Sequence, residues 1–229
     1  MAGKTIPIRS ADGGAFSGYL ATPSCGSGPG LLLLQEIFGV NHHIRALADL
    51  YAEEGYVVLA PDLFWRIKPG IELGYSDDDF KAALDYYQRF DVDQAIRDAG
   101  DALKTLRANA VCNGKAGALG FCLGGKLAYL AAARLPIDAA VSYYGVALEQ
   151  NLAEAQSINV QLRCISPPRT SSSRQPHARR FVLRSPATTA PRFTSIPRPI
   201  TPLITGSATP TIAPPPRSPI RARSACSAA

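Results

Sequence analysis

The sequence predicts an α/β fold with a doubly wound, mostly parallel sheet over residues 1–161, followed by a structureless tail over residues 162–229. Segments with strand character alternate with segments of helical periodicity, which is typical of a sheet covered by helices on both faces. The strand-like segments are short, continuous apolar runs, as expected of strands buried on both sides. After Val160 the alternation stops.

The N-terminal elements follow from local patterns. Two β-forming segments flank the turn sequence Ala11-Asp12-Gly13-Gly14 and predict a hairpin. Three further elements come next in the chain: a strand over Leu31–Leu34, a helix over 43–54 that Gly55 ends, and a strand over Tyr56–Ala60.

The middle of the chain continues the same order. Residues 77–109 predict either one long helix or two shorter ones, starting at the acidic capping sequence Ser76-Asp77-Asp78-Asp79. Three elements follow: a strand over Lys115–Phe121, a helix over Leu123–Arg134 and a strand over Ile137–Tyr143. A strand, helix and strand in this order favour parallel pairing.

The net charge of +6 averages two unlike parts of the chain. Residues 1–160 contain 13 basic and all 18 acidic side chains, whereas residues 161–229 contain 11 arginines and no acidic residue. The tail also holds 13 of the 19 prolines, a composition that cannot build a core. An arginine-rich tail allows a second hypothesis, a non-catalytic protein that binds nucleic acid. Phe181 and Phe193 are its only aromatic residues, so we consider nucleic-acid binding the weaker hypothesis.

The cysteines and the apolar runs indicate the cellular setting. Five cysteines in no CxxC spacing argue against a disulfide framework and a zinc site, and favour a reducing compartment. No apolar run is long enough to span a bilayer, and the first ten residues lack the apolar segment of a signal peptide. We therefore expect a cytoplasmic protein without membrane attachment, metal ion or cofactor, and favour a monomer.

One segment carries candidate chemistry, Gly120-Phe121-Cys122-Leu123-Gly124-Gly125, between an apolar strand and an apolar helix. It fits a nucleophile elbow, in which a sharp strand-to-helix turn requires glycines at Gly120, Gly124 and Gly125 and lifts the nucleophile, here Cys122, to the end of the sheet. At the helix N-terminus we expect the helix dipole to favour the thiolate.

Two alternatives compete with the elbow. Cys122 could instead be an ordinary buried cysteine, but that interpretation leaves the flanking glycines unexplained. Gly120 to Lys126 also fits the GxxxxGK spacing of a phosphate loop, but Leu127 stands where that loop needs Ser or Thr.

Four motifs together resemble the dienelactone hydrolase (carboxymethylenebutenolidase) family of the α/β-hydrolase superfamily, in that family's order and spacing. The motifs are Gln35-Glu36-Ile37-Phe38-Gly39-Val40-Asn41, Ala60-Pro61-Asp62-Leu63, the Cys122 segment, and Tyr143-Tyr144-Gly145-Val146. The resemblance covers about residues 5–160.

The resemblance implies a hydrolase of a small ester or lactone. Cys122 would attack the carbonyl and form an acyl-enzyme, and Glu36 would face the thiol in the resting state. The backbone N–H groups of Ile37 and Leu123 would form the oxyanion hole.

The resemblance also bears on the pocket. We expect Phe38 and Trp65 either to line the pocket or to belong to the core. Phe80 and Leu84 stand near the places where the family carries substrate-binding polar residues, with Lys81 and Arg89 as candidate substitutes. A different small ester or lactone is therefore as good a candidate substrate as dienelactone itself.

The family pattern breaks after the resemblance ends. The family completes its triad with an Asp and a His, but here no acidic residue follows Glu154 and His177 is the only histidine of the tail. His42 and His43 are expected at a helix start, away from the family's catalytic position. We therefore expect the chain as written to be impaired or inactive, since loss of a general base costs about 10²–10⁴ in rate.

A shifted reading frame would account for the tail. In a frame that starts one base earlier, the codons of Leu162–Ser171 permit Ala-Ala-Leu-His-Phe-Ala-Ala-Lys-Asp-Glu, with Asp across the codons of Arg169 and Thr170. The codons of Ile200–Leu203 permit Asp-His-Ala-Phe, with His across Ile200 and Thr201. Both fall at the family spacing, and we therefore interpret the tail as a frameshift product.

Overall fold

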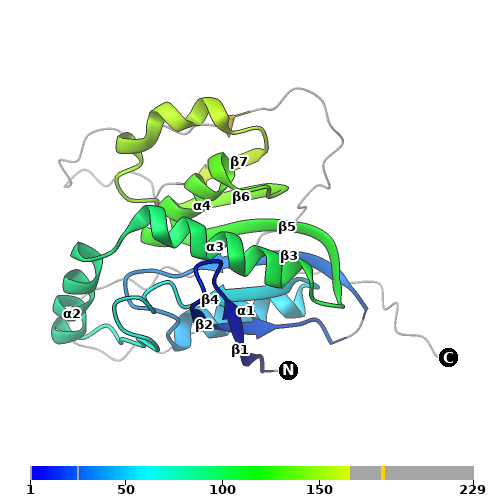
Figure 1. Cartoon of the computed structure of the whole chain (residues 1–229), viewed down its shortest axis with the longest axis horizontal. Helices are drawn as coiled ribbons and strands as arrows, with labels where there is room; N and C mark the ends of the chain where they lie inside the picture. Colours follow the sequence, from blue (N-terminus) through cyan, green and yellow to red (C-terminus); the bar gives the residue numbers. More distant parts are fainter. Residues whose placement is uncertain (1, 25, 166–181, 184–229) are drawn as a thin grey trace, which may run out of the picture. The chain divides into compact units, whose positions relative to one another are not determined.

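The computed structural model describes residues 2–24, 26–165 and 182–183, and arranges their strands in one sheet in the order β1-β2-β4-β3-β5-β6-β7-β8 (Figure 1). The strands are β1 (Lys4–Arg9), β2 (Ala15–Ala21), β3 (Gly28–Leu34), β4 (Val57–Pro61), β5 (Cys112–Phe121), β6 (Ala139–Tyr143), β7 (Gln161–Ile165) and β8 (Val182–Leu183). The helices are α1 (His42–Glu53), α2 (Asp77–Gln88), α3 (Val92–Arg107) and α4 (Leu123–Arg134), with a 3₁₀ segment η1 (Leu148–Ser157).

The sheet is mostly parallel. The strands β4, β3, β5, β6 and β7 run in one direction, while β2 joins β4 and β1 in antiparallel pairs. The short β8 pairs antiparallel with β7. The predicted α/β fold and the opening hairpin are thus confirmed.

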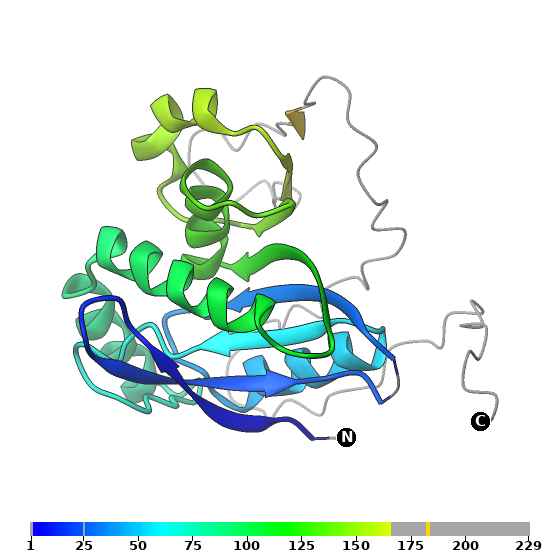
Figure 2. The same cartoon turned by 45° about the vertical axis from the view of Figure 1, so that its right-hand side comes forward.

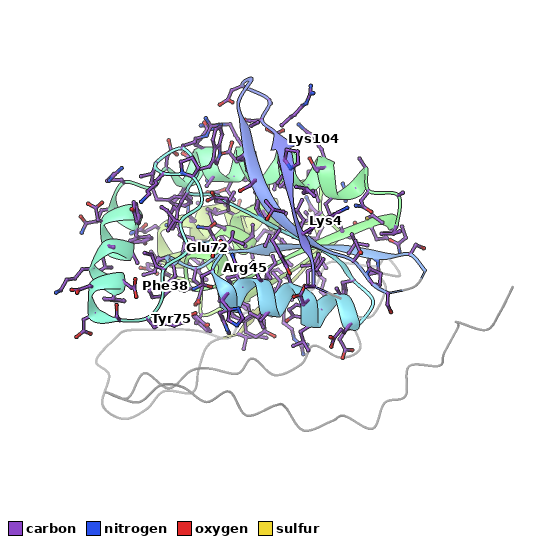
Figure 3. All side chains as sticks on the ribbon, turned by 90° about the horizontal axis from the view of Figure 1, so that it is seen from below. Lys4, Phe38, Arg45, Glu72, Tyr75 and Lys104 are labelled. Carbon is purple, nitrogen blue, oxygen red and sulfur yellow. The ribbon has the colours of Figure 1, made fainter. Side chains whose placement is uncertain are left out.

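The direction of chain progress across the sheet explains where the helices lie. From β3 the chain moves outward to β4, and from there it returns past β3 to β5 and on to β6. Because parallel crossovers are right-handed, this reversal puts α1 on one face and α3 and α4 on the other. Figures 2 and 3 show α1 and α3 on opposite sides of the strands.

The core follows the continuous apolar runs. Leu32, Leu33 and Leu34 of β3 have no exposed surface, and neither has any residue of Val57–Ala60 in β4. Strands buried this completely need cover on both faces, which the two helix layers supply.

The segment 77–109 forms two helices. Ser76 caps α2 through a capping box with Asp79, and the Asp91 side chain accepts from the N–H of Gln94 to start α3. Because a second capping residue lies inside the segment, it forms two shorter helices rather than one long helix.

The predicted boundary of the folded part lies too early in the chain. Residues of the expected tail form β7, where Leu162 is 2% exposed and the Ile165 carbonyl accepts from the N–H of Tyr144 at 2.7 Å. The edge of β6 offers backbone donors and acceptors, which any proline-free segment can satisfy. The first tail proline, Pro167, comes just after β7. The rest of the expected tail, Val182–Leu183 excepted, lies outside the described residues.

Two further features of the described part concern membranes and metals. It contains no helix that combines the length and the apolar character needed to cross a membrane. Within the same residues, no three His, Cys, Asp or Glu side chains gather where they could hold a metal ion.

A buried carboxylate ties α3 to the loop after β4. Asp98 is 1% exposed and accepts from Arg66 at 2.8 and 2.9 Å and from the Trp65 ring nitrogen at 2.8 Å. We expect Asp98→Ala to lower the free energy of unfolding by about 3 kcal/mol, because Arg66 and Trp65 lose their acceptor. Urea denaturation measures this. Asp78→Ala, which removes an exposed pair with Lys81, should change stability by less than about 0.5 kcal/mol, and equal effects would contradict the assignment.

Candidate active site

Glu36 and Cys122 lie where the fold most readily binds a ligand. Glu36 comes two residues after β3 and Cys122 directly after β5, and these two strands pair in parallel. The chain leaves β3 toward one side of the sheet and β5 toward the other. At such a switch point the connections diverge and leave a crevice at the carboxyl ends of the strands.

The backbone at Cys122 has the conformation of a nucleophile elbow. Its φ of 53° and ψ of −115° are strained for a residue with a side chain. The Cys122 N–H donates to the Tyr143 carbonyl at 3.0 Å, and its own carbonyl accepts from Lys126 and Val146. Hydrogen bonds to both β6 and α4 therefore maintain this strained backbone conformation.

The three elbow glycines lie where the backbone of a neighbouring segment passes too close to leave room for a side chain. A Cβ on Gly120 would lie 2.2 Å from the Gly124 carbonyl oxygen, and one on Gly124 would lie 2.1 Å from that of Leu34. On Gly125 it would lie 2.5 Å from the Tyr143 carbonyl oxygen. These contacts let α4 start directly against β3 and β6, and they give the steric reason for the glycine spacing.

Adding one methyl group at this contact should be costly. We expect Gly124→Ala to lower the free energy of unfolding by about 3 kcal/mol, because the methyl group meets the rigid backbone of Leu34. The control is Gly100→Ala in α3, where the new Cβ meets only the flexible end of Leu135, and where a change within about 1 kcal/mol is expected. Chemical denaturation that gives both variants the stability of the parent would contradict the packing described.

The resting state of Cys122 is the neutral thiol. Burial and, to a lesser extent, the negative charge of Glu36 raise the pKa of the thiol to about 11, although a hydrogen bond from the Leu123 N–H acts in the opposite direction. The expectation that the helix dipole favours the thiolate is therefore wrong for this state, because desolvation and a nearby carboxylate outweigh the helix end.

The Glu36 carboxyl holds a proton more readily than an exposed glutamate does. Burial raises the pKa of its carboxyl, while the hydrogen bond from Tyr144 opposes that rise. The Tyr144 hydroxyl donates to Glu36 Oε1 over 3.5 Å, and Tyr144 itself has a φ of 39°. The motif Tyr143-Tyr144-Gly145-Val146 contains Tyr144, but nothing in the sequence indicates that its hydroxyl reaches Glu36.

Two backbone N–H groups near Glu36 and Cys122 in the sequence, those of Ile37 and Leu123, were expected to act as donors. The N–H of Leu123 begins α4 and donates to Cys122, as the effect on the thiol pKa indicates. The N–H of Ile37 has no hydrogen-bond partner among the described residues. A backbone N–H without a partner is free to donate to a ligand.

The two aromatic pocket candidates lie in different places. Phe38 is 8% exposed and packs edge-on against Tyr75, with ring centroids 4.9 Å apart, close to Glu36 in the chain (Figure 3). Trp65 instead stacks on Phe16 at 5.3 Å and donates to Asp98. The structure thus brings Phe38 to the loop that carries Glu36, and gives Trp65 packing contacts with β2 and α3.

The histidines of the described part lie at the start of α1. Asn41 caps this helix, rather than either histidine, by accepting from the Ile44 N–H at 3.2 Å. Burial lowers the pKa of His43. No contact joins either histidine to Cys122 in the described residues.

Known proteins resemble this chain in sequence. The model of the dienelactone hydrolase family matches residues 16–166. The carboxymethylenebutenolidase of Pseudomonas putida is 37% identical over 154 residues, which are 67% of this chain and 65% of that protein. Carboxymethylenebutenolidase 1 of Cupriavidus pinatubonensis is 36% identical over the same length, 67% of this chain and 66% of that protein. The chain thus spans about 65% of the length of the first of these relatives.

Solved structures agree on the fold. The dienelactone hydrolase of Anabaena variabilis superposes with a TM-score of 0.54 at 19% identity, covering 72% of this chain and 74% of that one. A dienelactone-hydrolase-like promiscuous phosphotriesterase from metagenomic libraries gives a TM-score of 0.57 at 25% identity, covering 72% and 68%. With the family match spanning well over half of its residues, this chain belongs to the dienelactone hydrolase family.

Proposed function

We propose that Cys122 attacks the carbonyl of a small ester or lactone and becomes acylated. The observation that carries this proposal is the strained elbow, which holds a thiol within electrostatic range of the Glu36 carboxylate and within hydrogen-bond reach of the Leu123 N–H. An ordinary buried cysteine needs neither the positive φ nor three glycines at contact distance from neighbouring backbone.

The proposed acylation uses groups at the site. The thiol proton passes to Glu36, whose raised pKa makes it a stronger base, as the sulfur–carbon bond forms. The carbonyl electron pair moves to oxygen, where the N–H groups of Ile37 and Leu123 stabilise the negative charge, each worth about 3 kcal/mol. The C–O bond then breaks, the leaving oxygen takes the proton from Glu36, and a thioester remains.

Hydrolysis of the thioester is the step that this chain performs poorly. Water must be activated by a base. The Glu36 carboxylate is a weaker base than an imidazole, and the described residues bring no histidine to Cys122. We therefore propose that the chain acylates readily but turns over slowly. A reducing cytoplasm, in which the free thiols of Cys112, Cys122 and Cys164 persist, is the proposed setting.

The missing base agrees with a shifted reading frame after about Val160. The family match ends at residue 166, and 11 arginines with no acidic residue follow residue 160. We propose that residues 162–229 are read in the wrong frame and replace the part of the family fold that would carry the Asp and the His.

The proposed acylation can be followed with p-nitrophenyl acetate in stopped flow. We expect a burst of about one equivalent of p-nitrophenolate and then a steady rate about 10²–10⁴-fold below that of a relative with its base. The control, Cys122→Ser, keeps the shape of the site but should give no burst, because an unactivated hydroxyl is a weak nucleophile. A burst of equal size in this variant would remove Cys122 from the mechanism.

A further inference from the structure

An exposed apolar surface lies on α2 and on the segment before it. Tyr75, Phe80 and Leu84 are 43%, 45% and 38% exposed, and we call them the α2 strip. The described residues contain only one other large apolar side chain this exposed, Leu152 on η1. Single exposed apolar residues are ordinary, but three within ten residues form a surface that favours a partner or ligand.

The α2 strip is continuous with the candidate active site. Phe38 lies 4.9 Å from Tyr75 and 6.4 Å from Phe80 between ring centroids. Leu84 follows Phe80 by four residues and therefore shares its side of α2. The pKa of the Tyr75 phenol is raised by burial and also by the charge of Glu36, so this ring lies within electrostatic range of the site.

Backbone pairing fixes the strip to the loop that carries Glu36. Gly39 bridges Glu72, and the Leu73 N–H donates to the Phe38 carbonyl at 2.9 Å. The Asn41 side chain donates to the Leu73 carbonyl, also at 2.9 Å. These bonds hold the segment just before α2 against the loop that follows Glu36.

The charges around the strip disfavour an anion. Helix α2 contains four aspartates and one lysine, a net charge of −3. Lys81 pairs with Asp78 at 3.2 Å and Arg89 with Asp85 at 3.0 Å. Arg45 of α1 pairs with Glu72, which belongs to the segment before α2. The strip thus offers apolar surface beside carboxylates and paired cations.

We propose that the α2 strip binds the uncharged hydrocarbon part of the substrate, so that the site selects neutral apolar esters or lactones over substrates that carry a carboxylate. The chemistry at Cys122 rests on the proposed function, but the binding preference does not. Burial of each methylene against such a surface favours binding, whereas a carboxylate placed there loses water and meets negative charge.

The binding preference can be measured without any turnover. Hexanamide and the anion of adipic acid monoamide have the same chain length, and differ in ending in a methyl group or a carboxylate. Each is tested at pH 9 for protection of Cys122 against iodoacetamide, read from the Cys122 peptide by mass spectrometry. We expect hexanamide to protect at a concentration at least about tenfold lower, which corresponds to about 1.4 kcal/mol.

A matched pair of variants locates the preference. Leu84→Arg places a cation on the strip and should reduce or reverse the preference, while Leu152→Arg makes the same change on η1 and should leave it intact. Both positions are exposed, so neither change disturbs the core. Equal protection by the two amides, or an unchanged preference in Leu84→Arg, would overturn the proposal.

A p-nitrophenyl hexanoate burst in the same samples separates the two proposals. Selective protection without a burst supports the binding surface and removes the proposed acylation. A burst without selective protection supports the acylation and removes the binding surface.

Discussion

Alkylation of Cys122 by iodoacetamide at pH 7 should be roughly 10- to 100-fold slower than alkylation of an exposed free thiol. A thiol with a pKa of about 11 is ionised to about one part in 10⁴ at pH 7, against a few per cent for an ordinary cysteine. The greater nucleophilicity of the more basic thiolate recovers about tenfold of this difference. The rate should therefore rise about tenfold per pH unit and level off only near pH 11.

The carboxylate of Glu36 is one cause of the slow reaction, and its removal should speed it. In Glu36→Gln the repulsion between the carboxylate and the thiolate disappears, so the pKa of Cys122 falls and the rate at pH 7 rises several-fold. Glu72→Gln is the control, since Glu72 pairs with Arg45 and does not act on the thiol pKa. Peptide-resolved mass spectrometry separates Cys122 from the other cysteines. A rate already level between pH 7 and 9 would contradict a buried neutral thiol.

Restoring the alternative reading frame after the Val160 codon should raise ester turnover by about 10²–10⁴-fold. The restored chain would gain an Asp across the Arg169 and Thr170 codons and a His across the Ile200 and Thr201 codons. A histidine base would activate the water that cleaves the thioester, and general base catalysis is worth about this factor. The steady rate after the burst measures it, while the burst itself should stay near one equivalent.

Two comparisons make this result specific to the histidine. A second restored gene, with that histidine codon replaced by an alanine codon, should fold as the first does but return to the slow steady rate. The unshifted gene should keep its low turnover at every pH. A restored chain no faster than the chain as written would contradict the frameshift, as would resequencing that finds the same frame in independent isolates.

Much of the fold could be predicted because its signals are local. The continuous run at Leu31–Leu34 can be satisfied only by burial on both faces, and the glycines around Cys122 by close backbone contact. Capping residues mark where helices begin, as Asp91 does for α3. Such signals require no knowledge of distant residues.

The sequence alone was misleading where the outcome depends on distant partners. Strand β7 forms in a segment that the sequence assigned mostly to the structureless tail, because the neighbouring edge of β6 supplies backbone hydrogen bonds. The state of the Cys122 thiol depends on burial and on Glu36, not only on the helix that follows it. Trp65 finds its acceptor on Asp98, 33 positions along the chain, and no local pattern contains that information.

The most direct test of the central claim is to locate the acyl group after a brief reaction with p-nitrophenyl acetate and an acid quench. Proteolysis and tandem mass spectrometry should place it on the peptide that contains Cys122, as a thioester that hydroxylamine removes, and Cys164 should stay unmodified. An acyl group spread over lysines and surface cysteines, with the Cys122 peptide unchanged, would contradict the account.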